Sequence, residues 1–184
     1  MTNTLFDALM GPHRGSERVF LILPDGNALS YGDIDRLSAR LANLLIAKGV
    51  TPGDRVAVQN DKSPEAICLY LATLQLGGVY LPLNTAYTGA EIDYFLGDAA
   101  PRLFVCTPAT LADHKARETA GLRVESLGAK GDGSLMALAE DVAGKAGERD
   151  FAVMIETVQS WLGDHLHAHA GAGRLNQQAA GGKL

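Results

Sequence analysis

The spacing of apolar residues changes repeatedly along this 184-residue chain. Short apolar runs of four or five residues, typical of strands, alternate with longer stretches in which apolar residues recur every three or four positions, as on one face of a helix. Glycine, proline, asparagine and aspartate cluster where one pattern gives way to the other. The pattern therefore predicts strands that alternate with helices.

A β-hairpin and a helix open this succession. Val19–Leu23 is an apolar, β-rich run, Pro24–Asn27 has the composition of a turn, and Ala28–Ser30 returns to an extended pattern. The next segment has helical spacing and ends at Gly49, a residue suited to a helix C-terminus. The apolar positions of this predicted helix are Ile34, Leu37, Leu41, Leu44 and Leu45.

Three further helices are expected between four further strands. One begins at Ser63 and Pro64, carries Ile67, Leu71 and Leu74 on one face and ends at Gly77-Gly78. Another begins with the capping box Thr88-x-x-Glu91 and stops before Pro101, and the third covers Ala109–Thr119. A weak helix is predicted at Leu135–Val142. The strands are Arg55–Gln59, Val79–Leu81 (stopped by Pro82), Leu103–Cys106 and Arg123–Ser126.

This order predicts an α/β fold, a mostly parallel sheet with helices on both faces. Strands joined by helical connections of 10–15 residues pair in parallel through right-handed crossovers. The predicted strands are apolar without clean alternation, as a sheet buried on both faces requires. An exposed edge of such a sheet invites pairing with another chain, so self-association through that edge is a possible outcome.

Composition narrows the classes of protein that fit. Apolar residues make up 47% and charged residues 20%, which is typical of a globular protein. The net charge is −5 with scattered basic residues, so no nucleic acid is expected as a partner. Long apolar runs such as Leu41–Val50 contain Asn43 and Lys48 and are too short to span a membrane. Cys68 and Cys106 are expected as free buried thiols in a cytoplasmic protein.

Two segments resemble one known superfamily. Leu29–Gln59 (LSYGDIDRLSARLANLLIAKGVTPGDRVAVQ) is similar to the first conserved block of acyl-CoA synthetases, adenylation domains and luciferases, and Tyr70–Cys106 is similar to the second. Within the superfamily, Lys62–Ala66 and Gly77–Thr88 look most like malonyl-CoA synthetases. The resemblance extends from about Leu5 to Val153 and implies residues 1–153 as a partial N-terminal AMP-binding domain.

The resemblance implies an incomplete N-terminal portion of the adenylate-forming fold and an ATP-dependent acid–CoA ligase. Such enzymes turn a small carboxylic acid, here malonate or a similar acid, into an acyl-adenylate and then transfer the acyl group to coenzyme A, with Mg²⁺ and ATP as cofactors. The family cradles ATP with a loop of the type T-S-G-T-T-G-x-x-K, which matches no segment here. No catalytic, cofactor-binding or metal-binding residue carries over, and the fragment alone is expected to be inactive.

The last 31 residues, 154–184, differ in character from the rest. They contain the only tryptophan, three of the five histidines and no β-branched residue after Val158. Reading the codons of Gly163–His167 one nucleotide later permits Ala-Ile-Ile-Tyr-Thr, the apolar strand expected before the phosphate loop. An aberrant or disordered tail read out of frame is therefore expected, with genuine divergence or an assembly artefact as the alternatives. A metal site at His165, His167 and His169 is a weaker interpretation than such a tail.

Other candidate groups have structural explanations. The glycine-rich Gly128–Ser134 lacks a lysine before its serine and is expected to be a surface loop rather than a phosphate cradle. His114 is expected to be solvated, in a helix rich in polar residues. First-turn carboxylates are favoured by the helix dipole, so no acid–base pair is inferred from Asp33, Asp35, Glu91 and Asp93. Packing roles, with hydroxyls near the surface, are expected for Tyr31, Tyr80, Tyr87 and Tyr94.

A second function remains open on these observations. The alternative is a stand-alone α/β binding or interaction module without catalysis, in which the tail is a genuine segment that docks a partner. The two functions differ in whether adenylation chemistry exists at all.

Overall fold

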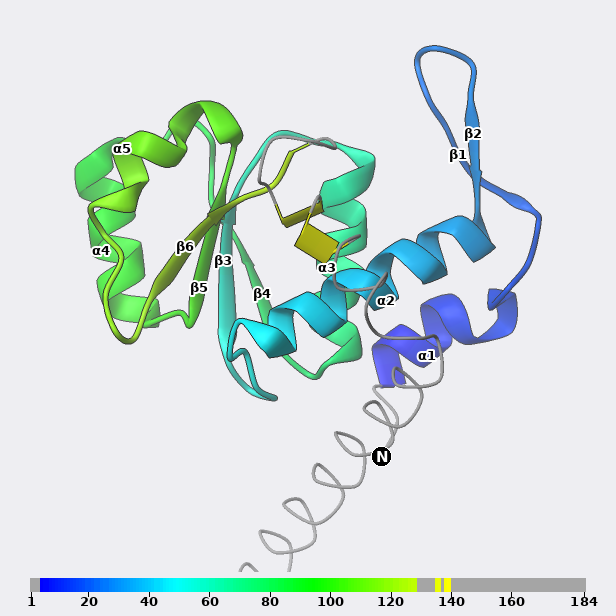
Figure 1. The fold of residues 1–184 in the computed structure, drawn as a ribbon, viewed down its shortest axis with the longest axis horizontal. Coiled ribbons are helices and arrows are strands. Elements are labelled where there is room, and N and C mark those ends of the chain that lie inside the picture. The colour runs from blue at the N-terminus through cyan, green and yellow to red at the C-terminus, as the bar shows by residue number, and fades with distance from the viewer. Residues whose placement is uncertain (1–3, 129–134, 137, 140–184) are drawn as a thin grey trace, which may run out of the picture.

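The computed structural model describes residues 4–128, 135–136 and 138–139. The chain begins with α1 (Thr4–Met10) and the 3-10 turn η1 (Gly11–His13), followed by the antiparallel hairpin of β1 (Val19–Ile22) and β2 (Ala28–Ser30). The hairpin projects away from the main sheet (Figure 1). It was predicted, whereas α1 was not.

Within the described residues the main sheet has four strands, all parallel, in the order β4-β3-β5-β6. In register, Val56 of β3 lies opposite both Tyr80 of β4 and Leu103 of β5. Pro82 ends β4, which is tolerated because β4 is an edge strand and needs no donor on its outer side. The strands are β3 (Arg55–Gln59), β4 (Val79–Pro82), β5 (Leu103–Cys106) and β6 (Arg123–Ser126), as predicted apart from one residue at the end of β4.

The helices start where the sequence provides caps. α2 (Tyr31–Ala47) starts at Ser30, whose hydroxyl accepts from the backbone N–H of Asp33 while the Asp33 carboxylate accepts from that of Ser30. Gly49 follows α2 with φ of 86°, a left-handed conformation that favours glycine. α3 (Pro64–Gln75) starts at Ser63, and α4 (Gly89–Ala99) starts with the predicted Thr88–Glu91 capping box.

The helices cover both faces of the sheet, which confirms the predicted α/β architecture. α2 and α3 lie on one face and α4 and α5 (Leu111–Lys115) on the other (Figure 1). Alternate strand residues serve the two faces: Val56 and Val58 contact the first layer, and Ala57 between them contacts the second. Phe6 and Met10 of α1 extend the first core and are buried to 2% and 1% exposure.

One helix is shorter than predicted, and the burial along α3 can be compared with its predicted apolar face. The helix expected at Ala109–Thr119 is only η2 (Pro108–Thr110) and α5, because Thr119 accepts two backbone N–H bonds and closes a turn. On α3, Leu71 is buried in the first core and Ile67 and Leu74 are partly buried against the same core, as expected for residues on one face. The most buried side chains of α3 are those of Cys68, Leu69, Ala72 and Thr73.

His114 is not solvated, contrary to prediction. Its side chain is 7% exposed, and its ring packs against Phe104 of β5 at 5.1 Å between centroids. The polar residues around it lie on the outer face of α5, whereas position 114 faces the sheet.

Several predictions fall largely or wholly outside the described residues. They concern the end of the 1–153 domain, the 154–184 tail with its frame hypothesis, the three alternating histidines and the loop at Gly128–Ser134. Of the weak helix predicted at Leu135–Val142, the described residues are helical, and Leu135, Met136 and Ala139 are buried in the first core. None of the described helices has the length and apolarity needed to cross a membrane.

Candidate functional site

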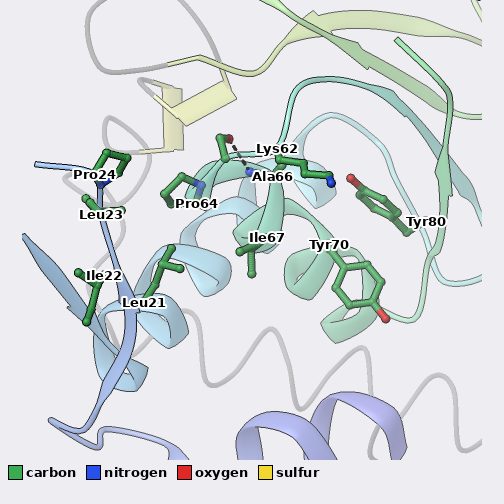
Figure 2. Close-up of a pocket in the computed structure, with 11 residues that line it drawn as sticks. Leu21, Ile22, Leu23, Pro24, Lys62, Pro64, Ala66, Ile67, Tyr70 and Tyr80 are labelled. Atoms are coloured by element: carbon green, nitrogen blue, oxygen red, sulfur yellow. Dashed lines mark hydrogen bonds between the residues drawn. The ribbon is translucent and has the colours of Figure 1, made fainter. Parts of the chain in front are cut away.

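An apolar groove of about 540 Å³ lies between the hairpin and α3. We call it the hairpin groove. Figure 2 shows Leu21 and Pro24 of the hairpin on one side and Pro64 and Ile67 of α3 on the other. Its lining is completed by Ile22, Leu23, Lys62, Ser63, Ala66, Tyr70 and Tyr80. It arises because the hairpin stands clear of the sheet and leaves the outer side of α3 uncovered.

Few polar groups reach this groove. Lys62 lies three residues after the carboxyl end of β3, and its amino group points toward Tyr80 in Figure 2. Burial raises the pKa of Tyr80, so this phenol is neutral at physiological pH. The hydroxyl of Ser63 is already committed to capping α3, since it accepts from the N–H of Ala66 at 3.2 Å. The groove can therefore hold an apolar body with one anionic group near Lys62.

Polar groups that follow β3 and β5 at the carboxyl end of the sheet are bonded to neighbouring protein groups. Gln59 at the end of β3 is 6% exposed and donates from Nε2 to the carbonyl of Asn84 at 2.9 Å, which ties β3 to the segment after β4. After β5, the hydroxyls of Thr107 and Thr110 lie 3.0 Å apart. Ligands of open α/β sheets bind at this end. Here these groups already bond each other, which makes the end of the sheet a structural junction.

A second groove, of about 550 Å³, lies between α4 and the segment that joins α5 to β6. Its charged centre is Arg117, which donates to the carboxylate of Asp93 at 2.6 Å and to the carbonyl of Asp113 at 3.0 Å. The nitrogen that bonds Asp113, Arg117 Nη1, also lies 3.1 Å from His114 Nδ1. Because arginine can only donate, Nδ1 is the acceptor and the neutral ring carries its proton on Nε2. This cluster binds α4 to α5 and leaves no charge free for a ligand.

The predicted first-turn carboxylates are separated by the sheet. Asp33 and Glu91 act as capping groups, and hydrogen bonds from Ser30 and Thr88 lower their pKa values. Burial raises the pKa of Asp35. Asp93 pairs with Arg117. Asp33 and Asp35 lie on α2, whereas Glu91 and Asp93 lie on α4 across the sheet.

The cysteines are free and buried, as predicted. Burial raises the pKa of Cys68 to about 12 and also raises that of Cys106, so both thiols stay protonated and unreactive. In the part of the chain that the structure describes, no group of three His, Cys, Asp or Glu side chains is placed to hold a metal ion.

The fold and these features agree with comparisons to known proteins. The chain belongs to the family of AMP-binding enzymes, whose sequence profile matches residues 11–159. The described residues correspond to the N-terminal portion of an adenylate-forming enzyme.

The similar proteins include enzymes of more than one kind. MatB of Rhodopseudomonas palustris is 43% identical, with a TM-score of 0.70 over 76% of this chain and 28% of its own. A feruloyl-CoA synthase of Amycolatopsis is 39% identical over 55% of this chain and 20% of its own length. A plipastatin synthase of Bacillus subtilis is 36% identical over 55% of this chain and 4% of its own. The chain thus spans a fifth or less of these two curated relatives.

Sequence reasoning did not identify the hairpin groove. The sequence did contain a sign of this groove in the run Val19–Leu23. The run is apolar at successive positions, so its apolar side chains lie on both faces of the hairpin, whereas a two-stranded hairpin can bury only one face. Ile22 is accordingly 70% exposed and Val19 56% exposed. Both segments that resemble malonyl-CoA synthetases contribute to this groove, Lys62–Ala66 directly and Gly77–Thr88 through Tyr80.

Proposed function

We propose that this chain forms the N-terminal scaffold of an acid–CoA ligase, which joins a carboxylic acid to coenzyme A through an acyl-adenylate. The observation that carries the proposal is the family match over residues 11–159. Adenylating enzymes transfer their activated acyl group to different acceptors. The similarity to MatB and to a feruloyl-CoA synthase supports coenzyme A as the acceptor here.

Malonate is the acid we propose. The support is the 43% identity to the malonyl-CoA synthetase MatB together with the malonyl-type residues Lys62–Ala66 and Gly77–Thr88. The proposed reaction converts malonate, ATP and coenzyme A into malonyl-CoA, AMP and pyrophosphate.

The described residues do not fit ATP or Mg²⁺ as ligands. Charge that develops on phosphoryl oxygens requires backbone N–H groups, a lysine and a metal ion. The capping carboxylates Asp33 and Glu91 are already bonded to their helix N-termini, and the described part of the chain has no group suited to a metal. We therefore assign no step of the reaction to these residues and propose that they supply scaffold.

Two assays test this proposal. The 184-residue chain, incubated with malonate, coenzyme A and Mg-ATP, is expected to release no pyrophosphate above background, with MatB as the positive control. A chimera of MatB that carries residues 11–159 of this chain in place of its own matching segment is expected to form malonyl-CoA. A folded chimera that forms feruloyl-CoA but not malonyl-CoA would contradict malonate as the acid and would leave the proposed ligase reaction standing. A folded chimera inactive with every acid would contradict the scaffold role.

A stand-alone interaction module is the second candidate function, and the hairpin groove favours it. Ile22 is 70% exposed beside an apolar surface, an arrangement typical of a docking site. Ile22→Asp would then abolish a defined oligomer seen by sedimentation velocity, with Glu17→Asp in the same hairpin region as the control. A wild-type chain that sediments as a monomer at all concentrations would contradict self-association through this groove.

A further inference from the structure

The hairpin groove has one charged position in an otherwise largely apolar lining. Of the described residues that line it, Lys62 is the one charged side chain. Asp61 and Glu65 are close to it in sequence but do not line the groove. Figure 2 shows the amino group of Lys62 and the hydroxyl of Tyr80 pointing toward each other. One end of the groove is therefore polar and carries a single positive charge.

Both of these polar groups are without a partner in the described part of the chain. No carboxylate there lies within ion-pair distance of Lys62. The ring of Tyr80 packs edge-on against Tyr70 at 5.3 Å between centroids, but its hydroxyl makes no hydrogen bond to a described residue. Burial raises the pKa of Tyr80, so the phenol keeps its proton and can donate it. An ammonium group and a neutral hydroxyl thus provide donors for one anion.

The apolar walls decide what that anion is attached to. Leu21 and Ile22 of the hairpin lie on one side and Pro64 and Ile67 of α3 on the other (Figure 2). Ile22 is 70% exposed, so an apolar ligand would remove hydrocarbon surface from water. The groove volume of about 540 Å³ is that of a small-molecule pocket, which combines apolar walls with a few convergent polar groups.

We propose that the hairpin groove binds a monocarboxylate with an apolar body. The carboxylate accepts hydrogen bonds from Lys62 Nζ and from the Tyr80 hydroxyl, and the hydrocarbon part lies between the hairpin and Ile67. Charge complementarity selects this ligand, because one unpaired ammonium group matches one negative charge. A second charge, as in malonate, would be left against apolar walls without a partner. The site therefore adds a ligand to those of the proposed ligase reaction.

The experiment follows the backbone amides of the isotope-labelled 184-residue chain by NMR while octanoate is added. Saturable shifts are expected at Leu23, Ala66 and Tyr80, which line the groove. Malonate is expected to cause none. Octanol has the same hydrocarbon chain without the charge, and we expect it to bind about tenfold more weakly, the contribution of one hydrogen bond to a charged group.

Variants separate the charge from the apolar walls. Lys62→Gln is expected to weaken octanoate binding about tenfold and to leave octanol binding unchanged. Lys62→Arg should keep most of the octanoate affinity. Arg18→Gln is the matched control, because it removes the same charge from an exposed residue of the hairpin region that does not line the groove. Ile22→Asp should weaken the binding of both ligands, because it places a charge in the apolar wall.

Three results would overturn the proposal. One is a folded chain whose groove amides do not shift with octanoate. Another is a Lys62→Gln variant that binds octanoate as tightly as the wild type, since the anion would then lie elsewhere. The third is a groove whose amides shift with protein concentration and not with octanoate, which would identify a second copy of this chain as the occupant. Each would leave the ligase proposal standing, because the chimera assay tests that separately.

Discussion

The two helical layers of this molecule are held in different ways. The layer of α2 and α3 has long helices of 17 and 12 residues, and its core is apolar and extends to Phe6 and Met10 of α1. The layer of α4 and α5 has a smaller apolar core, and α5 is only five residues long. Around it, Arg117 binds Asp93, His114 and a backbone carbonyl.

The difference shows what a short helix needs. Helices of a few residues are unstable alone, and their stability comes from tertiary contacts. α2 presents an apolar stripe long enough to hold it on the sheet. α5 is positioned by His114, which packs on Phe104, and by the polar contacts of Arg117. We therefore expect substitutions in the two layers to differ in size and in pH dependence.

Deleting a core leucine in each layer gives the largest expected effect. Leu69→Ala in α3 removes a fully buried side chain and should lower the free energy of unfolding by about 3–5 kcal/mol. Leu96→Ala in α4 should lower it by about 2 kcal/mol, because Leu96 is 8% exposed and its surroundings can relax. Urea denaturation measures both. Equal losses would show that the layers are packed alike.

Removing a helix cap should give the second-largest loss of stability. Ser30→Ala should destabilise α2 by about 1–2 kcal/mol, because Ser30 is 8% exposed and its hydroxyl accepts from the N–H of Asp33 at 3.1 Å. Thr88→Ala should cost about 0.5 kcal/mol, since the corresponding bond to Glu91 is 3.4 Å long and exposed. Urea denaturation of the two variants measures both losses in the free energy of unfolding. A larger loss for Thr88→Ala would reverse the comparison.

Acid should weaken the α4 and α5 layer selectively. Burial, assisted by Arg117, lowers the pKa of His114 below 6.5, while Asp113 and Asp93 oppose the shift. The unfolded chain therefore binds a proton that the folded chain does not, and stability falls as the pH drops below about 6.5. His114→Gln should flatten this part of the stability profile, with His13→Gln as the control. A wild-type profile that stays parallel to that of His114→Gln would contradict the assignment.

A substitution outside both helical layers should have the smallest effect on stability, and the other losses can be compared with it. Ile22→Ser in the hairpin should change the free energy of unfolding by less than about 0.5 kcal/mol, because the side chain is already 70% exposed. The same urea titration measures it. A loss comparable to that of Ser30→Ala would mean that the hairpin belongs to the cooperative core.

Sequence reasoning succeeded where the determinants are local. The strands β3, β5 and β6 and the caps at Ser63 and Thr88 occur at the predicted positions. An apolar run flanked by turn residues, or a serine three residues before its backbone partner, can be recognised within one short window. The parallel sheet and its two helical layers followed from the order of these elements.

It failed where the determinants are distant. α1 was missed because seven residues carry too little periodic signal, and Phe6 and Met10 are buried only through contact with other elements. His114 was misplaced because its neighbours in sequence are polar while its neighbour in space is Phe104. The hairpin groove was missed because the residues after β3 meet the hairpin only in the folded chain.

The sequence by itself determined the elements, their order and the family, because each depends on residue patterns within short windows. The tertiary structure alone decided which polar groups are buried, which groove opens beside the hairpin, and which backbone carbonyl of β6 the Lys115 side chain reaches. Those properties depend on pairs of residues from different elements. Lys115 binds the carbonyl of Val124 because the turn after α5 brings them together, and no spacing of residue types along the chain encodes that contact.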